Sequence, residues 1–540
     1  MMRRHVIEEL TDWSTMRARF RWDIPHQFNI AKTCCDDWAD SAPDKIAIRH
    51  ISHDGTERAV SYARLAADSD ALAAGLARLG VGFGDRVAIL LPQCPEVMVA
   101  HFASYKLGAI ALPLFVLFGP DALAYRLADS GAKTLITDAE NAAKIARIRA
   151  DLPALETIIT LEETPGALAW STLTATPTDG FHPARTSAED PACLIYTSGT
   201  TGTPKGVVHA HRFLIGHLPA IECHHEGFGL PGDTGWTPAD WAWIGGLMDL
   251  AMPCLYYGVP LISHRMRKFD PDQAWNLIAR TGATNLFLPP TALKMMAGST
   301  VPAGVNIRAI GSGGESLGPA LLGWGKQELN AHINELYGQT ECNLVVSSCA
   351  AVGAERPGAM GRAVPGTTLA VIDAHGHELP PGRIGEIAVA RGHPAMFLRY
   401  WNKPAETEKK FQGNWMRTGD LGHMDAQGFV SFHARDDDVI TTSGYRVGPA
   451  EIEHCLCADP DIALAAVIGV PDATRTESIK AFVVLKPGAA WPGTEARLIA
   501  RIRRNLSPHM APRSIERRDH LPMTATGKIM RRALRDETPK

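Results

Sequence analysis

The chain has 540 residues, of which 45% are hydrophobic and 21% charged, and its formal net charge is −4. This length exceeds what a single hydrophobic core supports, so we expect at least two domains. The slightly acidic balance lacks the basic footprint that nucleic-acid binding requires, so we expect no nucleic-acid partner.

The sequence indicates neither a membrane span nor a metal-binding cysteine motif. Its most apolar stretch, residues 244–262, is interrupted by a charge, a glycine and two prolines, which predicts buried core and no integral membrane contact. The N-terminal residues lack the apolar segment of a secretory signal. The 10 cysteines are scattered without the two-residue spacing of zinc or redox sites. Reduced thiols and a cytoplasmic location are therefore expected.

Strand and helix patterns alternate along the first two thirds of the chain. Residues 1–50 predict helices lying over a domain, and residues 164–190 predict a connecting loop. The periodicity predicts a hairpin around Asp54-Gly55, helices over 67–79 and 96–107, and strands over 86–91, 110–114, 134–137, 157–160, 192–196, 207–209, 284–288 and 307–310. This alternation favours an α/β fold with parallel sheets.

The pattern changes near residue 360. Short alternating runs at 368–372, 385–389 and 428–432, separated by Gly/Pro turns, predict a small antiparallel sheet or β-barrel-like subdomain. Strands near 463–470 and 480–485 and a helix over 494–505 predict a small α+β domain at the C-terminal end. We therefore expect a large N-terminal domain, residues 1–435, and a small mobile C-terminal domain, residues 436–540.

The stretch from Tyr196 to Gly206 carries the clearest chemical signal. It holds three glycines, five Ser/Thr residues and one lysine, between two strand-like runs. Glycines let backbone N–H groups turn toward an anion, hydroxyls add donors and a lysine adds charge, which suits a polyphosphate. The Gly-Lys-Ser/Thr order of nucleotide triphosphatases is absent, and composition alone also fits a flexible surface turn.

The ordered string Tyr-Thr-Ser-Gly-Thr-Thr-Gly-Thr-Pro-Lys-Gly resembles the signature loop of the adenylate-forming (AMP-binding) enzymes. That superfamily includes the acyl-CoA synthetases, the adenylation domains of peptide synthetases and the luciferases. The resemblance extends in order over about residues 45–535 and is greatest to the short- and medium-chain acyl-CoA synthetases.

The resemblance implies a set of ATP- and AMP-binding residues. In the segment 335–341, Tyr337 would stack on adenine, Thr340 would meet the α-phosphate and Glu341 would bind Mg²⁺, a hard cation that carboxylates hold well. Asp420 would accept hydrogen bonds from both ribose hydroxyls. Ser316 replaces the proline or alanine usual beside the adenine. The full set is Thr197, Ser198, Gly199, Thr200, Thr201, Gly202, Thr203, Pro204, Lys205, Gly314, Glu315, Ser316, Glu335, Leu336, Tyr337, Gly338, Gln339, Thr340, Asp420, Arg435 and Lys528.

The same resemblance implies a two-step use of the C-terminal domain. Lys528 would catalyse adenylation together with Thr340 and Glu341, and Asp437 would be the hinge about which the domain rotates. CoA would then bind at Gln93, Ser443, Gly444, Tyr445, Arg446 and Arg475. Lys528 also resembles lysines modified by acetyltransferases and deacetylases in relatives. Homo-oligomerisation is a further expectation about partners.

The expected function is an ATP-dependent acid–thiol ligase that forms acyl-CoA from a carboxylic acid through an acyl-adenylate. Acetate-specific relatives block their pocket with a tryptophan where this chain has Tyr337-Gly338, which favours a medium-chain acid. The expected acyl pocket comprises Trp241, Trp243, Gly245, Gly246 and Gly338. Four alternatives stay open: an acetyl/propionyl- or aryl-acid ligase, an adenylate-only or luciferase-like enzyme, a peptide-synthetase module and a non-catalytic scaffold.

Overall fold

The computed structural model describes residues 5–197, 204–314, 317–435, 438–442, 445–472, 476–506, 510–524 and 528–538. The chain divides into two compact units. The first comprises Met1–Gly199, Thr203–Thr368 and Arg391–Lys410, and the second comprises Thr200–Gly202, Leu369–Ala390 and Phe411–Lys540. The domain boundary expected at residues 435–436 stays a prediction, and we describe each unit by itself.

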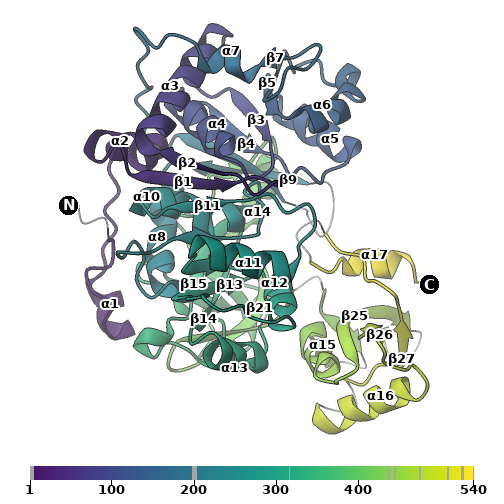
Figure 1. Ribbon diagram of the computed structural model, residues 1–540. Helices are drawn as coiled ribbons and strands as arrows, with labels where there is room; N and C mark the ends of the chain where they lie inside the picture. Colours follow the sequence, from purple (N-terminus) through teal and green to yellow (C-terminus); the bar gives the residue numbers. More distant parts are fainter. Residues whose placement is uncertain are drawn as a thin grey trace. The chain divides into compact units, whose positions relative to one another are not determined.

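The first unit contains two sheets (Figure 1). One has the strand order β16-β15-β14-β13-β12-β10-β11-β1-β2, and the other β19-β9-β8-β4-β3-β5-β6-β7. The strands of the former are β1 Ile46–Ile51, β2 Glu57–Ser61, β10 Gly235–Trp236, β11 Leu261–Ser263, β12 Asn285–Phe287, β13 Ala309–Gly313, β14 His332–Gln339, β15 Cys342–Ser347 and β16 Gly361–Ala363. Those of the latter are β3 Arg86–Leu90, β4 Ile110–Pro113, β5 Thr134–Thr137, β6 Thr157–Thr160, β7 Leu168–Ala169, β8 Pro191–Thr197, β9 Lys205–Ala210 and β19 Arg399–Tyr400.

Parallel pairing dominates the centre of both sheets, as the alternation of strands and helices predicts. Strand β13 pairs in parallel with β12 and β14, and β3 pairs in parallel with β4 and β5. The helices are α1 Trp13–Arg19, η1 Lys32–Asp36, α2 Asp37–Ser41, α3 Tyr62–Arg78, α4 Pro95–Lys106, α5 Pro120–Ser130, α6 Ala139–Ala146, η2 Arg149–Asp151, α7 Trp170–Thr174, α8 Phe213–His224, α9 Ile244–Gly246, η3 Leu247–Ala251, α10 Met252–Tyr257, α11 Pro271–Thr281, α12 Pro290–Ala297, α13 Pro319–Glu328, η4 Ala350–Val352 and α14 Pro404–Lys409. The α/β fold class is confirmed.

Three local predictions differ from the structure. Helix α3 begins at Tyr62, not at residue 67, because the Ser61 side chain caps it by accepting a hydrogen bond from the Arg64 amide. Residues 164–190 contain the short helix α7 where a loop is predicted, because the buried Leu173 packs into the core. Near the N-terminus the helices are α1, η1 and α2, whereas the aromatic residues at 20–22 follow α1 and pack outside any helix.

The second unit contains two sets of hydrogen-bonded strands. An antiparallel one has the strand order β17-β18-β21-β22, with β20 pairing β21, which agrees with the predicted small antiparallel sheet. The other has the order β24-β23-β26-β25, with β27 pairing β26. The strands are β17 Leu369–Ile372, β18 Gly385–Ala390, β20 Phe411–Gln412, β21 Trp415–Met424, β22 Phe429–Arg435, β23 Ile440–Thr442, β24 Tyr445–Val447, β25 Ile462–Asp472, β26 Thr476–Leu485 and β27 Ser514–Arg517.

Helices α15 Pro449–Cys457, α16 Thr494–Asn505 and α17 Arg531–Asp536 complete this unit. Alternate residues of β25 serve opposite faces, as a period of two requires. Ala465 and Val467 pack with α15 and α16, whereas Ala466 and Ile468 pack with Leu534 of α17. The residues around the Lys528 position are thus anchored by a hydrophobic cluster of their own.

Candidate active site

The predicted phosphate loop is held at its two ends by a β-hairpin. Strands β8 and β9 are antiparallel, with Thr197 opposite Lys205. The Tyr125 hydroxyl of α5 donates a hydrogen bond of 3.0 Å to the carbonyl oxygen of Pro204. Residues Ser198, Gly199, Thr200, Thr201, Gly202 and Thr203 lie outside the described residues. The hairpin fixes where the loop starts and ends, so Lys205 projects from a defined strand position.

Lys205 is held by an acidic side chain from α14. Its Nζ lies 3.0 Å from Glu406 Oε2 and 5.1 Å from the centre of the Tyr400 ring. Hydrogen bonds from Lys409 and Lys205 lower the pKa of Glu406 to about 2, so this carboxylate is ionised at neutral pH. The Lys205 ammonium group thus pairs with the Glu406 carboxylate, and a phosphate group could take the place of that carboxylate.

The predicted catalytic residue Glu341 meets the same tyrosine. It lies in the turn between β14 and β15, is 9% exposed, and accepts a hydrogen bond from the Tyr400 hydroxyl. The Phe397 amide donates to the Glu341 carbonyl oxygen at 2.8 Å. Tyr400 thus contacts two residues predicted from separate motifs, Glu341 and Lys205. Sequence reasoning missed Tyr400; its signal is the aromatic pair Tyr400-Trp401 just before the Lys403-Pro404 helix start.

Glu341 fits the magnesium ion that the family implies. Among the described residues no group of three or more His, Cys, Asp or Glu side chains could hold a metal by itself. Mg²⁺ is commonly bound through one or two carboxylates and the phosphates of the substrate, so a single buried carboxylate suffices. Within the described part of the chain, Glu341 Oε2 carries no hydrogen bond, whereas Oε1 is fixed by Tyr400. This carboxylate would suit a cation that is bound together with the phosphates of ATP.

The rest of the 335–341 motif follows β14 into this turn. Glu335 and Leu336 are buried in the strand, while Tyr337, Gly338, Gln339 and Thr340 are partly exposed toward its end. Burial raises the pKa of Glu335 to about 7, and its Oε1 accepts a hydrogen bond from the Leu317 amide. Gly314 has φ +102°, a conformation that favours glycine, and Glu315 and Ser316 lie outside the described residues.

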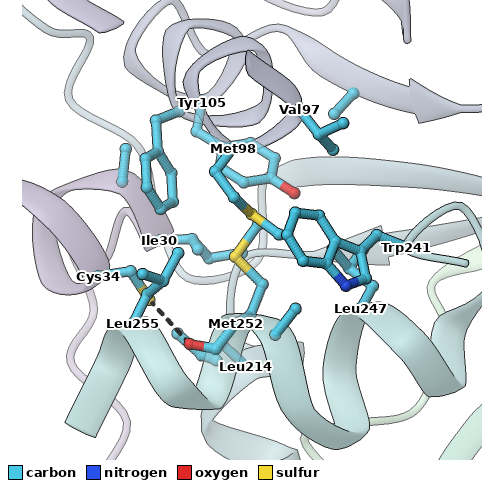
Figure 2. Packing of buried hydrophobic residues seen from close by; sticks show 14 of the residues in the cluster. Ile30, Cys34, Val97, Met98, Tyr105, Leu214, Trp241, Leu247, Met252 and Leu255 are labelled. Atoms are coloured by element: carbon cyan, nitrogen blue, oxygen red, sulfur yellow. Dashed lines mark hydrogen bonds between the residues drawn. The ribbon is translucent and has the colours of Figure 1, made fainter. Parts of the chain in front are cut away.

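The predicted acyl-pocket residues Trp241, Trp243, Gly245 and Gly246 are closely packed in the first unit. Trp241 is 2% exposed and lies beside Met98 and Met252 in the hydrophobic core (Figure 2). The Trp243 ring lies 5.9 Å from that of Phe287 and covers Gly245. A Cβ at Gly246 would meet the Asp240 carbonyl oxygen at 2.3 Å, so this position admits only glycine.

Gln93, predicted to contact CoA, has a structural contact in the first unit. It is 7% exposed, and its amide nitrogen donates to the carbonyl oxygens of Thr237 and Ala239, at 3.3 and 2.5 Å. These bonds fix the backbone just before Trp241. The CoA contact stays a prediction.

In the second unit two residues of the predicted ATP- and AMP-binding set lie together. Asp420 of β21 stands opposite Arg435 of β22, and Arg435 Nη1 lies 3.0 Å from Asp420 Oδ1. Asp420 is 4% exposed. The Arg435 guanidinium thus pairs with the carboxylate that is predicted to accept hydrogen bonds from the two ribose hydroxyls.

Lys528 is joined to Thr524 in the second unit by two hydrogen bonds. The Thr524 amide donates to the Lys528 carbonyl oxygen at 2.7 Å, and the Lys528 amide donates to Thr524 Oγ1 at 3.1 Å. Three residues later, Arg531 bonds Glu453 Oε2 at 2.7 Å and Asp438 Oδ2 at 3.1 Å. Asp438 directly follows the predicted hinge residue, so this cluster joins the lysine loop to the start of the C-terminal segment.

The remaining CoA and hinge predictions are not placed by the structure. Ser443, Gly444, Arg475 and Asp437 lie outside the described residues, and Tyr445 and Arg446 contribute the backbone of β24.

Comparison with known proteins identifies similar sequences along nearly the whole chain. A family model described as AMP-binding enzyme matches residues 35–401, and one described as AMP-binding enzyme C-terminal domain matches residues 451–528. Acetyl-coenzyme A synthetase of Bacillus subtilis (strain 168) is 34% identical over 97% of this chain and 93% of its own length. Mitochondrial acyl-coenzyme A synthetase ACSM4 of Rattus norvegicus is 31% identical over 95% of this chain and 91% of its own length.

Two solved structures share the fold. The acyl-CoA synthetase of Brucella canis superposes with a TM-score of 0.75 at 32% identity, covering 98% of this chain and 99% of that one. The anthranilate CoA ligase AuaEII in complex with anthranoyl-AMP gives a TM-score of 0.85 at 28% identity, covering 95% and 98% of the two chains. No helix among the described residues is long and apolar enough to cross a membrane.

Proposed function

The chain belongs to the AMP-binding enzyme family as an AMP-forming CoA ligase that uses ATP and CoA, and from this premise we propose that its substrate is a medium-chain carboxylic acid. The observation that carries the chain length is Gly338. A Cβ there would lie 2.3 Å from the Leu344 amide nitrogen, so no side chain can project from this position. The tryptophan that closes the pocket of acetate-specific relatives therefore has no counterpart, which supports a longer acyl chain.

The proposed reaction has two steps at one site. A carboxylate oxygen of the acid bonds to the α-phosphorus of ATP as the bond to pyrophosphate breaks, giving an acyl-adenylate. The CoA thiolate then bonds to the acyl carbon as the bond to AMP breaks, giving the thioester. Mg²⁺ at Glu341 supplies charge neutralisation to the phosphate oxygens when bound.

The residues of this chain orient and neutralise the phosphates in the first step. Lys205 and Lys528 supply positive charge, and Tyr400 holds the Glu341 carboxylate in one direction. Asp420 and Arg435 hold the ribose. We further propose that the C-terminal domain rotates about Asp437 between the steps, which withdraws Lys528 and brings Gly444, Tyr445 and Arg446 to CoA.

Acetate is the second candidate, because the Bacillus subtilis relative is named for acetyl-CoA. The test is AMP release with ATP and Mg²⁺, with and without CoA, across straight-chain acids from acetate to decanoate and benzoate. We expect CoA-dependent release with a maximum at intermediate chain length. Activity on acetate alone would refute the medium-chain assignment, and release that ignores CoA would indicate an enzyme that stops at the adenylate.

A further inference from the structure

Three polar side chains from different elements meet in the core of the first unit. His217 is on α8, Asp249 on η3 and Asn343 on β15, and they are 0%, 2% and 5% exposed. Asn343 Nδ2 donates to Asp249 Oδ1 at 2.5 Å and lies 3.2 Å from His217 Nε2. His217 Nδ1 lies 2.5 Å from the Phe213 carbonyl oxygen. We call His217, Asn343 and Asp249 the polar trio.

The bonds inside the polar trio fix its proton positions. The Phe213 carbonyl oxygen can only accept, so His217 Nδ1 carries the proton and Nε2 is an acceptor. Asn343 Nδ2 then donates one hydrogen to His217 and the other to Asp249. Both amide hydrogens are used, so the side chain of Asn343 has one defined orientation.

Two polar atoms of the trio remain without a partner. Among the described residues, no group bonds Asp249 Oδ2 or Asn343 Oδ1. Neither atom belongs to the unpartnered atoms that protein fully encloses, and Asp249 and Asn343 keep 2% and 5% exposure. A buried polar atom with no partner costs free energy, which a ligand that bonds it would recover.

The polar trio lies between the two segments that the proposed acyl pocket requires. Asp249 is three residues beyond Gly246 on one continuous run of helix, α9 and η3. Asn343 is two residues beyond Glu341, and a Cβ at Gly338 would meet the Asn343 Cα at 2.8 Å. An acyl chain that passes Gly338 would therefore approach Asn343.

We propose that the polar trio recognises a hydroxyl group on the acyl part of the substrate, so that the enzyme activates a hydroxyl-bearing acid. This inference rests on the proposed function, because it concerns the same pocket. Asn343 Oδ1 can only accept, so the ligand group must donate a hydrogen bond. Asp249 Oδ2 can donate a hydrogen bond when the Asp249 carboxyl group is protonated. A substrate hydroxyl group can donate to Asn343 Oδ1 and accept from Asp249 Oδ2 at the same time.

The environment of Asp249 agrees with the neutral form. Burial raises the pKa of Asp249 well above its ordinary value, with Asn343 opposing the shift through its hydrogen bond. A plain alkyl chain would leave both open atoms unpaired in a dry site. Sites built to bond a substrate hydroxyl discriminate strongly against the analogue that lacks it.

The test compares pairs of acids that differ only by a hydroxyl group: hexanoate and 6-hydroxyhexanoate, octanoate and 8-hydroxyoctanoate, and benzoate and 4-hydroxybenzoate. The measurement is kcat/KM for CoA-dependent AMP release. In at least one pair we expect the hydroxyl member to be preferred by about 10-fold or more. Preference for the plain acid in every pair would overturn the inference. If none of these acids, with or without the hydroxyl group, supports CoA-dependent AMP release, the proposed function itself is overturned.

Variants assign the preference to the polar trio. Asp249→Leu, and the double change Asp249→Leu with Asn343→Leu, should reduce the preference to within about 2-fold, because each removes at least one of the two open polar atoms that would bond the substrate hydroxyl group. Asp249→Asn keeps a donor and an acceptor and should retain the preference, which also covers the case in which Asp249→Leu fails to fold.

The matched control is Asn141→Leu. Asn141 is 1% exposed and donates to Asp138 Oδ1 at 2.8 Å, so it is a second buried Asn–Asp pair in the same unit. It should leave the hydroxyl preference unchanged. A preference that survives the double variant, or that disappears equally in Asn141→Leu, would contradict recognition by the polar trio.

Discussion

The contact between Tyr400 and Glu341 allows a prediction about ATP use. Tyr400→Phe removes the hydroxyl that donates to Glu341 and leaves the ring beside Lys205. Tyr400 and Glu341 are 4% and 9% exposed, so water replaces the lost bond poorly. A hydrogen bond to a charged group contributes about 1.5–3 kcal/mol, which corresponds to a loss of about 10- to 150-fold in kcat/KM for ATP.

The assay is kcat/KM for ATP at saturating acid and CoA, measured at several Mg²⁺ concentrations. Because Tyr400→Phe removes only the group that orients the Glu341 carboxylate, additional Mg²⁺ should restore part of the activity. Tyr62→Phe is the matched control: this hydroxyl donates to the Leu255 carbonyl oxygen at 3.0 Å, in the core of the same unit. If Tyr400→Phe changes kcat/KM by less than about 2-fold, or no more than Tyr62→Phe does, the positioning role of Tyr400 is refuted.

Two further predictions concern stability. Arg531→Met should destabilise the second unit by about 3 kcal/mol, because Glu453 loses its guanidinium partner while Asp438 keeps only Arg535. Arg532→Met, at an exposed position on the same helix, should cost less than about 0.5 kcal/mol. Hydrogen exchange of peptides covering α15 and β25 measures both, and equal protection in the two variants would contradict this. Burial lowers the pKa of His209 and of His393 to about 3. Each neutral imidazole therefore contributes stability that is present above pH 6.5 and is lost at about 1.4 kcal/mol per pH unit as the pH falls toward 3. Urea unfolding at pH 7, 6 and 5 should show this fall in the free energy of unfolding, and a constant value would refute it.

The sequence predicts the regular parts of the fold because their signals are local. The strands on either side of the phosphate loop, the hairpin around Asp54-Gly55 and helix α16 all follow from periodicity and turn residues within one short segment. The start of α3 is shifted by a single capping serine. The position of this helix start depends on one hydrogen bond, and the spacing of apolar residues contains no information about it.

The candidate site is predictable only where a motif carries it. Lys205 and Glu341 belong to ordered strings, but Tyr400, which contacts both, is about 60 residues beyond Glu341 and stands in no string of its own. The polar trio likewise joins positions 217, 249 and 343, which only the packing of α8, η3 and β15 brings together. Contacts between buried polar residues far apart in the sequence follow from the tertiary structure. The apolar periodicity of each segment therefore predicts only that these positions lie in the core.

A decisive experiment measures the two half-reactions separately in Lys528→Ala. We expect the acid-dependent exchange of pyrophosphate into ATP to fall by about 100-fold or more, because one cationic contact to the reacting phosphate is lost. Thioester formation from supplied acyl-AMP and CoA should continue at a rate close to that of the unchanged enzyme. An equal loss in both half-reactions, or unchanged exchange, would contradict the assignment of Lys528 to the adenylation step.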